Sequence, residues 1–360
     1  LRRSSAASDV YKRQRRYTFE IRPGKKLMKP RIALIPGDPS GIGPELVAKL
    51  LAEPGLSNEA DVLVIGDSHV LEMGQHQAGV KNGFQQVDPL GGEWVLENSE
   101  SFAFHPTQTT SISDVKIAEA TQSSGASVLS TLDIALDFAS DGIVDAVVFA
   151  PFNKQAMHLA GLGHDDELHY MATRLKVENY ISELNTFDGM WTSRVTSHIA
   201  LKEVAERVNE KNIGEAVWLI YQVLCNSGIS SPKISVAALN PHAGDGGNFG
   251  REEIDVIAPA VQSLQADGLP VDGPWPSDTV FLKAIAKEID AVVTMYHDQG
   301  QIALKLLGFS RGVTVQGGIP FPVTTPAHGT AFDIAGQGKA NLGATRAAYD
   351  LACKMVSHWG

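Results

Sequence analysis

The chain has 360 residues, of which 43% are hydrophobic, and its formal net charge is −11. This length is sufficient for two domains with a full hydrophobic core. No apolar run reaches the roughly 18 residues of a transmembrane helix. The negative charge also argues against nucleic acid and anionic membranes as partners. The two cysteines, Cys225 and Cys353, indicate no disulfide framework, so we expect a reducing, cytoplasmic compartment.

The charge is unevenly distributed along the chain. Residues 1–27 contain nine Lys or Arg and two acidic residues, a net charge of +7 that leaves −18 for the rest. This basic, serine-containing leader is compatible with an organelle transit peptide. We favour a non-native, disordered leader, because Met28 stands directly before the first convincing strand. Residues 1–27 are therefore left out of the fold prediction.

From residue 31 onward, short apolar segments alternate with longer segments of helical periodicity. This alternation predicts βαβ units, a largely parallel sheet and an α/β fold. Several strand segments are continuously apolar, as expected when helices cover both faces of a sheet. The predicted strands are 31–36, 61–66, 144–150, 194–196, 234–239 and 289–295. The predicted helices are 43–52, 68–75, 117–139, 168–175, 201–207, 213–225, 253–265 and 341–357.

The turn Pro36-Gly-Asp-Pro-Ser-Gly-Ile-Gly-Pro-Glu45 follows the first predicted strand and opens a helix. Backbone N–H groups at such a turn could hold an anion. The turn lacks the Gly-Lys-Ser/Thr of a P-loop and the spacing of the dinucleotide fingerprint. Its spacing alone favours a tight connection, with Pro44 in the first helical turn. Further along, the proline after Ala150 suggests a domain boundary, and we expect the chain to return to the first domain around Gly300.

Three of the eleven histidines, His198, His242 and His297, stand just beyond predicted strands. Open α/β sheets place their ligand sites beyond the carboxyl ends of parallel strands. Three imidazoles that converge there could bind Zn²⁺ or a similar cation and leave one position open for a substrate. A single histidine in such a place is usually a polar loop residue. For three histidines at equivalent strand ends, the metal site and the loop interpretation have equal weight.

Charged side chains accompany these histidines. Asp298 and Asp278 lie near the same predicted edge, where a carboxylate can orient a histidine, bind a metal or accept a substrate proton. Each could equally cap a loop. Lys305 lies on the helix that is predicted to follow His297. Lys305 could bind an anionic group or assist proton transfer, Lys154 is open to the same interpretations, and a solvated surface role is the alternative for both.

The segment from His328 to Asn341 contains glycines at 329, 336 and 338. Turns of this kind let an adenine ring lie against the main chain, with Asp333 or Asn341 available to bond the ribose or the base edge. By composition alone, the segment is only a pair of short helices joined by loops.

Five segments together resemble the 4-hydroxythreonine-4-phosphate dehydrogenase family of vitamin B6 biosynthesis. They occur in the order and at the spacing of that family, and the resemblance covers about residues 31–355. The segments are 36–45, 240–250, 273–278, 296–300 and 328–341. The first and the last also resemble isocitrate and isopropylmalate dehydrogenases, which share the fold. The resemblance implies a three-layer α/β/α subunit of two domains that forms a homodimer, with its active site in a cleft near the dimer interface.

The resemblance also implies the cofactor and the metal. Residues 28–150 together with 300–360 would form the nucleotide-binding domain, and residues 151–299 the domain for metal, substrate and dimerisation. A divalent metal (Zn²⁺, or alternatively Mg²⁺, Mn²⁺ or Co²⁺) would be held by the three histidines, or with one ligand from the partner subunit. NAD or NADP would contact His328, Gly329, Thr330, Asp333, Gly336 and Asn341.

The implied reaction is oxidation of a β-hydroxy acid to a β-keto acid that loses CO₂. The metal would act as a Lewis acid on the hydroxyl and carboxylate oxygens. The proposed catalytic residues are Asp298, Lys305 and Asp278. A phosphate acyltransferase, whose fold is related, is a less favoured alternative, because it would need neither the nicotinamide site nor the three histidines.

The expected substrate pocket departs from the family at three places. His164-Asp165 stands where the family has His-Thr, Val323 replaces a phosphate-binding Arg and Thr314 replaces an Asn, while Lys305 remains. An Arg–phosphate pair is charge-assisted and bidentate, and a neighbouring Asp repels a dianion. The substrate is therefore 4-hydroxythreonine 4-phosphate or a close relative, or alternatively an unphosphorylated acid such as a carboxylated cis-dihydrodiol of the terephthalate type.

Overall fold

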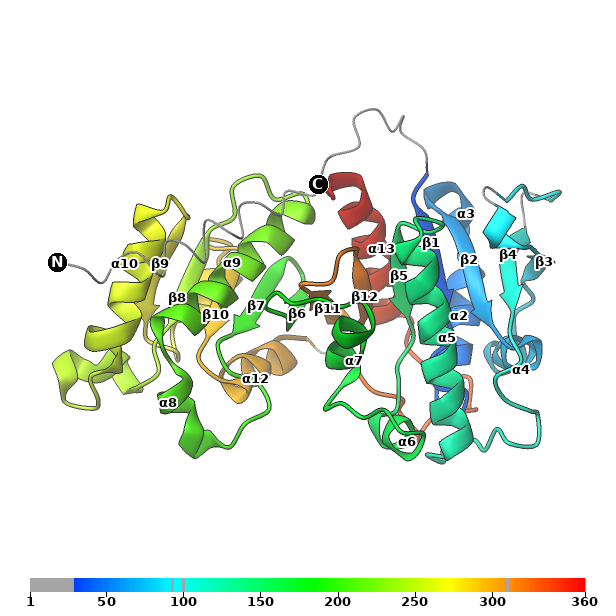
Figure 1. The fold of residues 1–360 in the computed structure, drawn as a ribbon, viewed down its shortest axis with the longest axis horizontal. Helices are drawn as coiled ribbons and strands as arrows, with labels where there is room; N and C mark the ends of the chain where they lie inside the picture. Colours follow the sequence, from blue (N-terminus) through cyan, green and yellow to red (C-terminus); the bar gives the residue numbers. More distant parts are fainter. Residues whose placement is uncertain (1–28, 92–93, 99–100, 309–310, 360) are drawn as a thin grey trace.

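The computed structural model describes residues 29–91, 94–98, 101–308 and 311–359. The basic leader 1–27 lies outside these residues. In the described part of the chain, the strands form a 12-stranded sheet in the order β3-β4-β2-β1-β5-β12-β11-β6-β7-β10-β8-β9 (Figure 1). The helices in these residues include none that is long and apolar enough to cross a membrane.

The strands are short. In chain order they are β1 Arg31–Ile35, β2 Asp61–Gly66, β3 Gly83–Gln86, β4 Ser101–Pro106, β5 Ala146–Phe149, β6 Ser182–Phe187, β7 Met190–Arg194, β8 Ile234–Ala237, β9 Val271–Trp275, β10 Ala291–Thr294, β11 Val313–Gly317 and β12 Val323–Pro326. The α-helices are α2 Gly43–Leu51, α3 Leu56–Glu59, α4 Ser68–Ala78, α5 Gln122–Ser140, α6 Lys154–Leu159, α7 Glu167–Arg174, α8 Val204–Arg207, α9 Glu210–Asn226, α10 Ala258–Ala266, α11 Val280–Ile285, α12 His297–Gly308 and α13 Gly343–His358. Short 3-10 or π-helical segments are η1 Pro89–Gly91, η2 Leu201–Glu203, η3 Pro241–Gly247 and η4 Glu253–Ile257.

The sheet consists of two parallel blocks that are joined by antiparallel pairs. The first block is β3-β4-β2-β1-β5-β12, and the second is β7-β10-β8-β9. Between them, β11 pairs antiparallel with β12 and β6, and β6 pairs antiparallel with β7. The prediction of an α/β fold with a largely parallel sheet is confirmed. Because the second block is parallel throughout, the carboxyl ends of β7, β10 and β8 share one edge of the sheet. The division into two domains stays a prediction.

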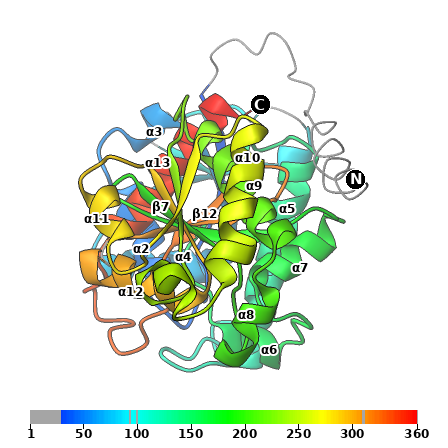
Figure 2. The ribbon, with the colours of Figure 1, turned by 90° about the vertical axis from the view of Figure 1, so that its left-hand side faces the viewer.

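Helices cover both faces of the sheet, which gives the predicted three layers. On β1, Ile32 and Leu34 pack in a cluster that includes α2, α9, α10 and α13. The alternating Ala33 and Ile35 pack against α5 and α7 on the other face. In the second block, α11 and α12 cover that other face. Figure 2, which views the molecule along its long axis, shows helices on both sides of the central strands.

Helix starts depend on capping side chains. The helix predicted from residue 117 begins at Gln122, because the Thr121 hydroxyl accepts the N–H of Ser124 at 3.0 Å and forms a capping box. Asp166 caps α7 in a similar way, by accepting the N–H of His169 at 2.9 Å. These caps fix where α5 and α7 begin.

Candidate functional site

Two of the three predicted metal ligands converge in one chain. His198 follows β7 and His297 opens α12 after β10, and the centroids of their rings are 5.5 Å apart. His242 lies beyond the next strand, in η3, where its exposed ring lies 6.3 Å from the ring of Phe249. Among residues 29–91, 94–98, 101–308 and 311–359, no three His, Cys, Asp or Glu side chains are arranged to hold a metal ion. One described chain therefore supplies at most part of the predicted metal site.

A carboxylate faces the Nδ1 atom of each of these two rings. The Nδ1 atom of His297 lies 2.7 Å from Oδ1 of Asp298, and that of His198 lies 3.8 Å from Oδ2 of Asp166. A carboxylate only accepts hydrogen bonds, so Nδ1 of His297 donates, and in a ring with this one proton the lone pair is on Nε2. This arrangement is typical of metal-binding histidines. The donor chemistry of the pair therefore fits a divalent cation that takes a further ligand from elsewhere.

The surroundings of His198 favour its neutral form. Burial has the largest effect and lowers the pKa of His198; the nearby Glu183 raises this pKa, whereas Lys154 and Arg194 lower it. Neutral imidazole is the form that binds metal ions. Asp298, which was predicted as a catalytic group, is 73% exposed and bonded to His297, so its observed contact is with the histidine.

Helices α6 and α7 bring further charges from the first block to the same edge. Asp166 contacts both His198 and the exposed His169, whose Nδ1 atom lies 2.6 Å from Oδ1 of Asp166. Lys154 lies 3.7 Å from the buried carboxylate of Glu167, and burial raises the pKa of that carboxyl. Sequence reasoning missed Asp166 and Glu167, although the cap pattern of an Asp before a Glu and an apolar residue could have identified the start of α7.

The predicted substrate residues His164 and Asp165 belong to the loop directly before this cap. The ring of His164 is half-buried and meets Tyr170 edge to face, with centroids 6.0 Å apart. Asp165 is exposed. Because Asp166 contacts His198, the loop lies beside the two histidines. This is the neighbourhood that the sequence predicted for a substrate.

A buried polar network lies beneath the two histidines. Arg194, at the end of β7, donates to Glu183 at 2.7 Å, to Asn185 at 3.2 Å and to Ser197 at 3.1 Å. Since Ser197 directly precedes His198, this network fixes the start of the loop that carries the histidine. Asn185 also donates to Oγ1 of Thr314 at 2.9 Å. Thr314, which was predicted to bind substrate, is buried and engaged within the sheet.

The other predicted substrate and catalytic residues are more scattered. Lys305 is exposed on α12 and lines a small recess together with Asn185 and Gln301. Val323 has no solvent-exposed area and packs in the core on β12. A ligand cannot reach its side chain in this packing, so we do not retain Val323 as a direct substrate contact. What remains of the prediction is that this position supplies no cation for a phosphate. Asp278 is exposed ahead of α11, and no hydrogen bond or ion pair joins it to the histidines within the described chain.

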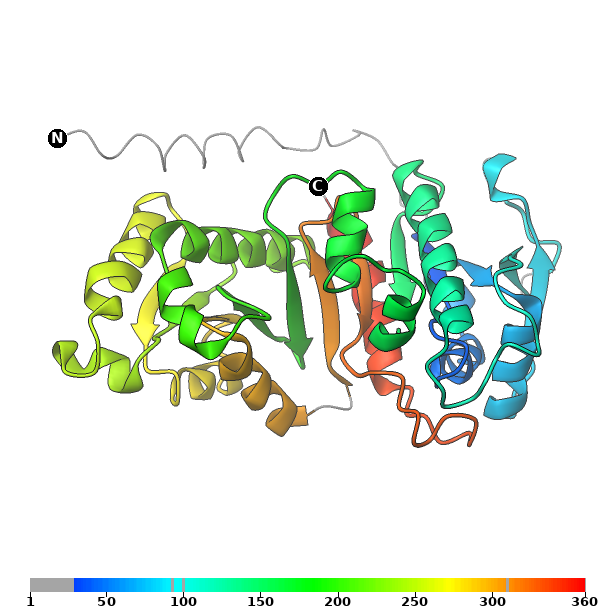
Figure 3. The same ribbon diagram turned by 60° about the horizontal axis from the view of Figure 1, so that its bottom comes forward.

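The segment predicted to bind the cofactor is held against the first strand-to-helix turn. It leaves β12 and runs along the edge near α2 (Figure 3). The N–H of Ile42 donates to the carbonyl of Thr330 at 3.1 Å. The turn at 36–45 is thus a tight connection, as its spacing favoured, and it also supports the cofactor segment. The side chain of Thr330 is buried, whereas Gly329, Asp333, Gly336 and Asn341 are exposed.

A lysine ties the far end of this segment to α2. Lys49 donates to Glu45 at 2.7 Å, to the carbonyl of Gly338 at 3.0 Å and to that of Ala340 at 2.8 Å. Glu45 in turn accepts the N–H of Ala340 at 2.8 Å. Gly338 has φ +71°, and a Cβ there would lie 2.7 Å from the carbonyl oxygen of Gln77. Contacts within the protein therefore hold this segment in its conformation without a cofactor.

His328 has a defined tautomer. Its Nδ1 atom lies 3.0 Å from the carbonyl oxygen of Gly329, and because a carbonyl only accepts, Nδ1 carries the proton. Burial lowers the pKa of His328 and favours the neutral ring. The Oδ1 atom of Asn341 accepts the N–H of Gly343 at 2.8 Å, which leaves the Nδ2 group of its amide as a donor.

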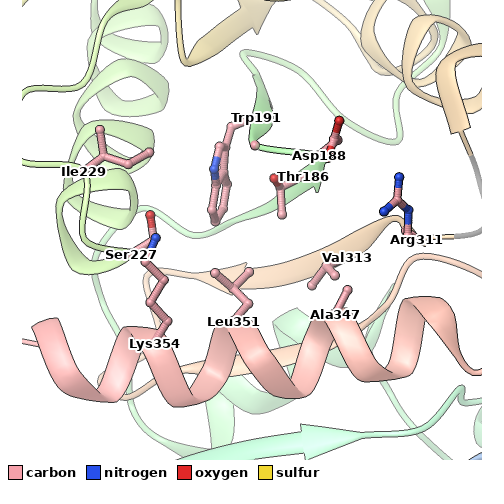
Figure 4. A pocket seen from close by; sticks show the side chains of 11 residues that line it. Thr186, Asp188, Trp191, Ser227, Ile229, Arg311, Val313, Ala347, Leu351 and Lys354 are labelled. Carbon is pink, nitrogen blue, oxygen red and sulfur yellow. The ribbon is translucent and has the colours of Figure 1, made fainter. Parts of the chain in front are cut away.

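A larger cavity, of about 220 Å³, lies away from these residues (Figure 4). It is located between α13, the end of α9 and the β6–β7 hairpin, so it borders the start of β7 rather than its end. The residues that line it include Trp191, Val313, Leu351, Arg311 and Lys354. None of the predicted site residues lines it, and we place the candidate site at the histidine edge.

Polar side chains at the carboxyl ends of parallel strands and a preformed glycine-rich segment are typical of α/β enzymes. The family described as "Pyridoxal phosphate biosynthetic protein PdxA" matches residues 58–352. The chain belongs to the PdxA family and is a dehydrogenase of that family. A relative from Pseudomonas aeruginosa, named "Putative 4-hydroxythreonine-4-phosphate dehydrogenase 2", is 49% identical over 331 residues, which are 91% of this chain and 98% of the relative.

Two solved structures extend this comparison. The 4-hydroxythreonine-4-phosphate dehydrogenase of Klebsiella pneumoniae is 34% identical, with a TM-score of 0.80 over 91% of this chain and 98% of that one. A terephthalate 1,2-cis-dihydrodiol dehydrogenase of Burkholderia xenovorans LB400 is 26% identical, with a TM-score of 0.63 over the same shares. The resemblance inferred from the sequence segments is confirmed at the level of the family.

Proposed function

We propose that this chain oxidises a β-hydroxy acid with NAD or NADP and a divalent metal, and that the β-keto product loses CO₂. The pair of His198 and His297 carries this proposal, because each ring has a carboxylate at Nδ1 and the pair lies beside Lys154. NAD(P), held against residues 328–341, supplies the hydride acceptor.

The proposed cation is Zn²⁺, or alternatively Mg²⁺, Mn²⁺ or Co²⁺. It would be held by His198 and His297, with His242 of the partner subunit as the third ligand, and it supplies Lewis-acid chemistry at the hydroxyl and carboxylate oxygens of the substrate. We propose a ligand from a second copy because His242 does not form a three-residue metal site with the other two histidines within the described residues of one chain.

Exposed apolar side chains on the second block of strands and beside His242 support a homodimer. On α12, Ile302 and Leu306 are 59% and 83% exposed, one helical turn apart. On α11, Leu282 and Ile285 are also exposed, and both helices pack on β10. Phe249, beside His242, is exposed as well. Apolar stripes of this kind on neighbouring elements are typical of surfaces that a partner covers.

Lysines would bind and deprotonate the substrate. Lys154 is a half-exposed cation beside the histidines, and we assign to it the carboxylate of the substrate. Asp298 is engaged with His297, so we favour Lys305 on the same helix as the proton acceptor, a role that requires its amine to be neutral when the substrate binds. Asp278 would have to reach the site from across the dimer interface to take part.

We propose 4-hydroxythreonine 4-phosphate or a close relative as the substrate, on the strength of the names of the relatives. The buried Val323, which offers no cation for a phosphate, favours the alternative of an unphosphorylated acid such as a carboxylated cis-dihydrodiol. Initial rates of NAD(P)H formation with both kinds of acid decide between them. A rate only with the unphosphorylated acid would overturn the first assignment.

The role of Lys154 can be tested in the same assay. Lys154→Met should raise KM for the acid by about 10-fold or more, because one charge-assisted contact of about 1.5–3 kcal/mol is lost. Lys211→Met, in which the lysine likewise loses an ion pair with a largely buried glutamate, Glu215, is the matched control and should leave KM unchanged. Equal KM values for the Lys154 variant and the wild type would exclude the lysine from substrate binding.

A further inference from the structure

Asp166 lies between two histidines that belong to different elements. Its Oδ1 atom accepts the backbone N–H of His169 at 2.9 Å and faces Nδ1 of the same residue at 2.6 Å. Its Oδ2 atom lies 3.8 Å from Nδ1 of His198. The Asp166 side chain is only 4% exposed, whereas that of His198 is 48% exposed. The carboxylate is therefore the buried partner and the His198 ring the exposed one.

The two oxygens of Asp166 have separate roles in this arrangement. Oδ1 is occupied by the cap of α7 and by His169, so Oδ2 is the oxygen left for His198. A separation of 3.8 Å exceeds the roughly 2.9 Å of a direct hydrogen bond. A rotation of the exposed His198 ring would bring its Nδ1 atom within hydrogen-bond distance of Oδ2, and one water molecule could bridge the two atoms as they stand. The neighbouring pair, His297 and Asp298, shows the closed form of the same relation at 2.7 Å.

We propose that Asp166 is a positioning residue that holds His198 with its proton on Nδ1 and with Nε2 free to bind the divalent cation. This inference rests on the proposed metal role of His198. Asp166 caps α7, which follows β5 of the first block, whereas His198 follows β7 in the second block. The orientation of one metal ligand therefore depends on how α7 packs beside the second block.

Asp166→Asn tests this role with two measurements. The amide oxygen of Asn still accepts the N–H of His169, so the cap of α7 is retained. The amide N–H₂ group would face His198 as a donor, which favours the tautomer with the proton on Nε2. We expect the Kd for Zn²⁺, measured by competition with a chelating dye, to rise by about 10–100-fold. In the metal-free full-length protein, ¹⁵N NMR of the ring should show His198 shifting from the Nδ1–H to the Nε2–H tautomer.

Two further variants separate positioning from general effects. His169→Gln removes the other partner of Asp166 and should keep the wild-type Kd. Asp133→Asn, which removes a carboxylate that Tyr170 of α7 contacts at 2.8 Å, should also keep it. Equal weakening in His169→Gln would assign the effect to the start of α7 and overturn the proposal. An unchanged His198 tautomer in Asp166→Asn would overturn it as well. Absence of Zn²⁺ binding by the wild type would refute the proposed function, while the tautomer of the metal-free protein would still decide the role of Asp166.

Discussion

Lys49 links the first helix to the cofactor segment, and its removal should be costly. Its ammonium group is the cation paired with Glu45, whose carboxylate is fully buried, and it also bonds the carbonyls of Gly338 and Ala340. Lys49→Met would leave that carboxylate without its cation. Breaking a buried ion pair by removing one partner costs about 3–5 kcal/mol. Because the Lys49 side chain is 22% exposed, water can replace part of the contact, and we expect a loss of about 3 kcal/mol.

The same change should weaken cofactor binding. If about half of this energy serves to order residues 336–341 before binding, the Kd for NAD(P)H rises by about 10-fold, which corresponds to 1.4 kcal/mol. Urea unfolding and fluorescence titration with NAD(P)H measure the two effects. The double variant Glu45→Gln, Lys49→Met should regain much of the stability, because no buried charge is left. A Lys49→Met protein with wild-type stability and wild-type Kd would refute this account of the segment.

Three other outcomes follow from particular side chains. Burial raises the pKa of Asp38 to about 6 from the ordinary 3.8, so the folded chain binds this proton more tightly than the unfolded chain. The free energy of unfolding should therefore fall by up to about 3 kcal/mol as the pH rises from about 4 to 6. Urea unfolding of Asp38→Asn at several pH values should not show this fall. Val323→Arg would bury a guanidinium and should lower the free energy of unfolding by more than about 3 kcal/mol; a stable variant that binds inorganic phosphate would contradict this. Ile302→Asp combined with Leu306→Asp should yield monomers in light scattering, whereas Val95→Asp, an equally exposed control, should remain dimeric; a dimeric double variant would place the interface elsewhere.

The sequence predicted the strands that are buried on both faces. Residues 32–36 and 146–150 are continuously apolar, and the structure contains β1 and β5 there. It did not predict β6, β11 or β12, which form or flank the antiparallel junction between the blocks. Those strands carry polar side chains such as Asn185 and Thr314, which bond to each other in the buried network. Hydrophobic periodicity cannot reveal a strand whose inward side chains are polar and paired across the sheet.

The expectation that ligand sites lie beyond the carboxyl ends of parallel strands located part of the site. His198 and His297 lie together because β7 and β10 are neighbours in the sheet, and the sequence alone does not show which strands are neighbours. The path of the chain near His242 depends on a long-range contact, since Glu253 accepts the N–H groups of Leu239 and Asn240 at 2.9 and 2.7 Å. Such a contact leaves no recognisable pattern in the sequence around His242.

The metal requirement is the central claim, and one assay tests it most directly. The enzyme is dialysed against a chelator, and NAD(P)H formation from 4-hydroxythreonine 4-phosphate is followed before and after Zn²⁺, Mg²⁺, Mn²⁺ or Co²⁺ is added. The rate should fall to background on chelation and return with at least one of these ions in the wild type, and no ion should restore it in His297→Ala. A chelated wild type that keeps its full rate would contradict the account.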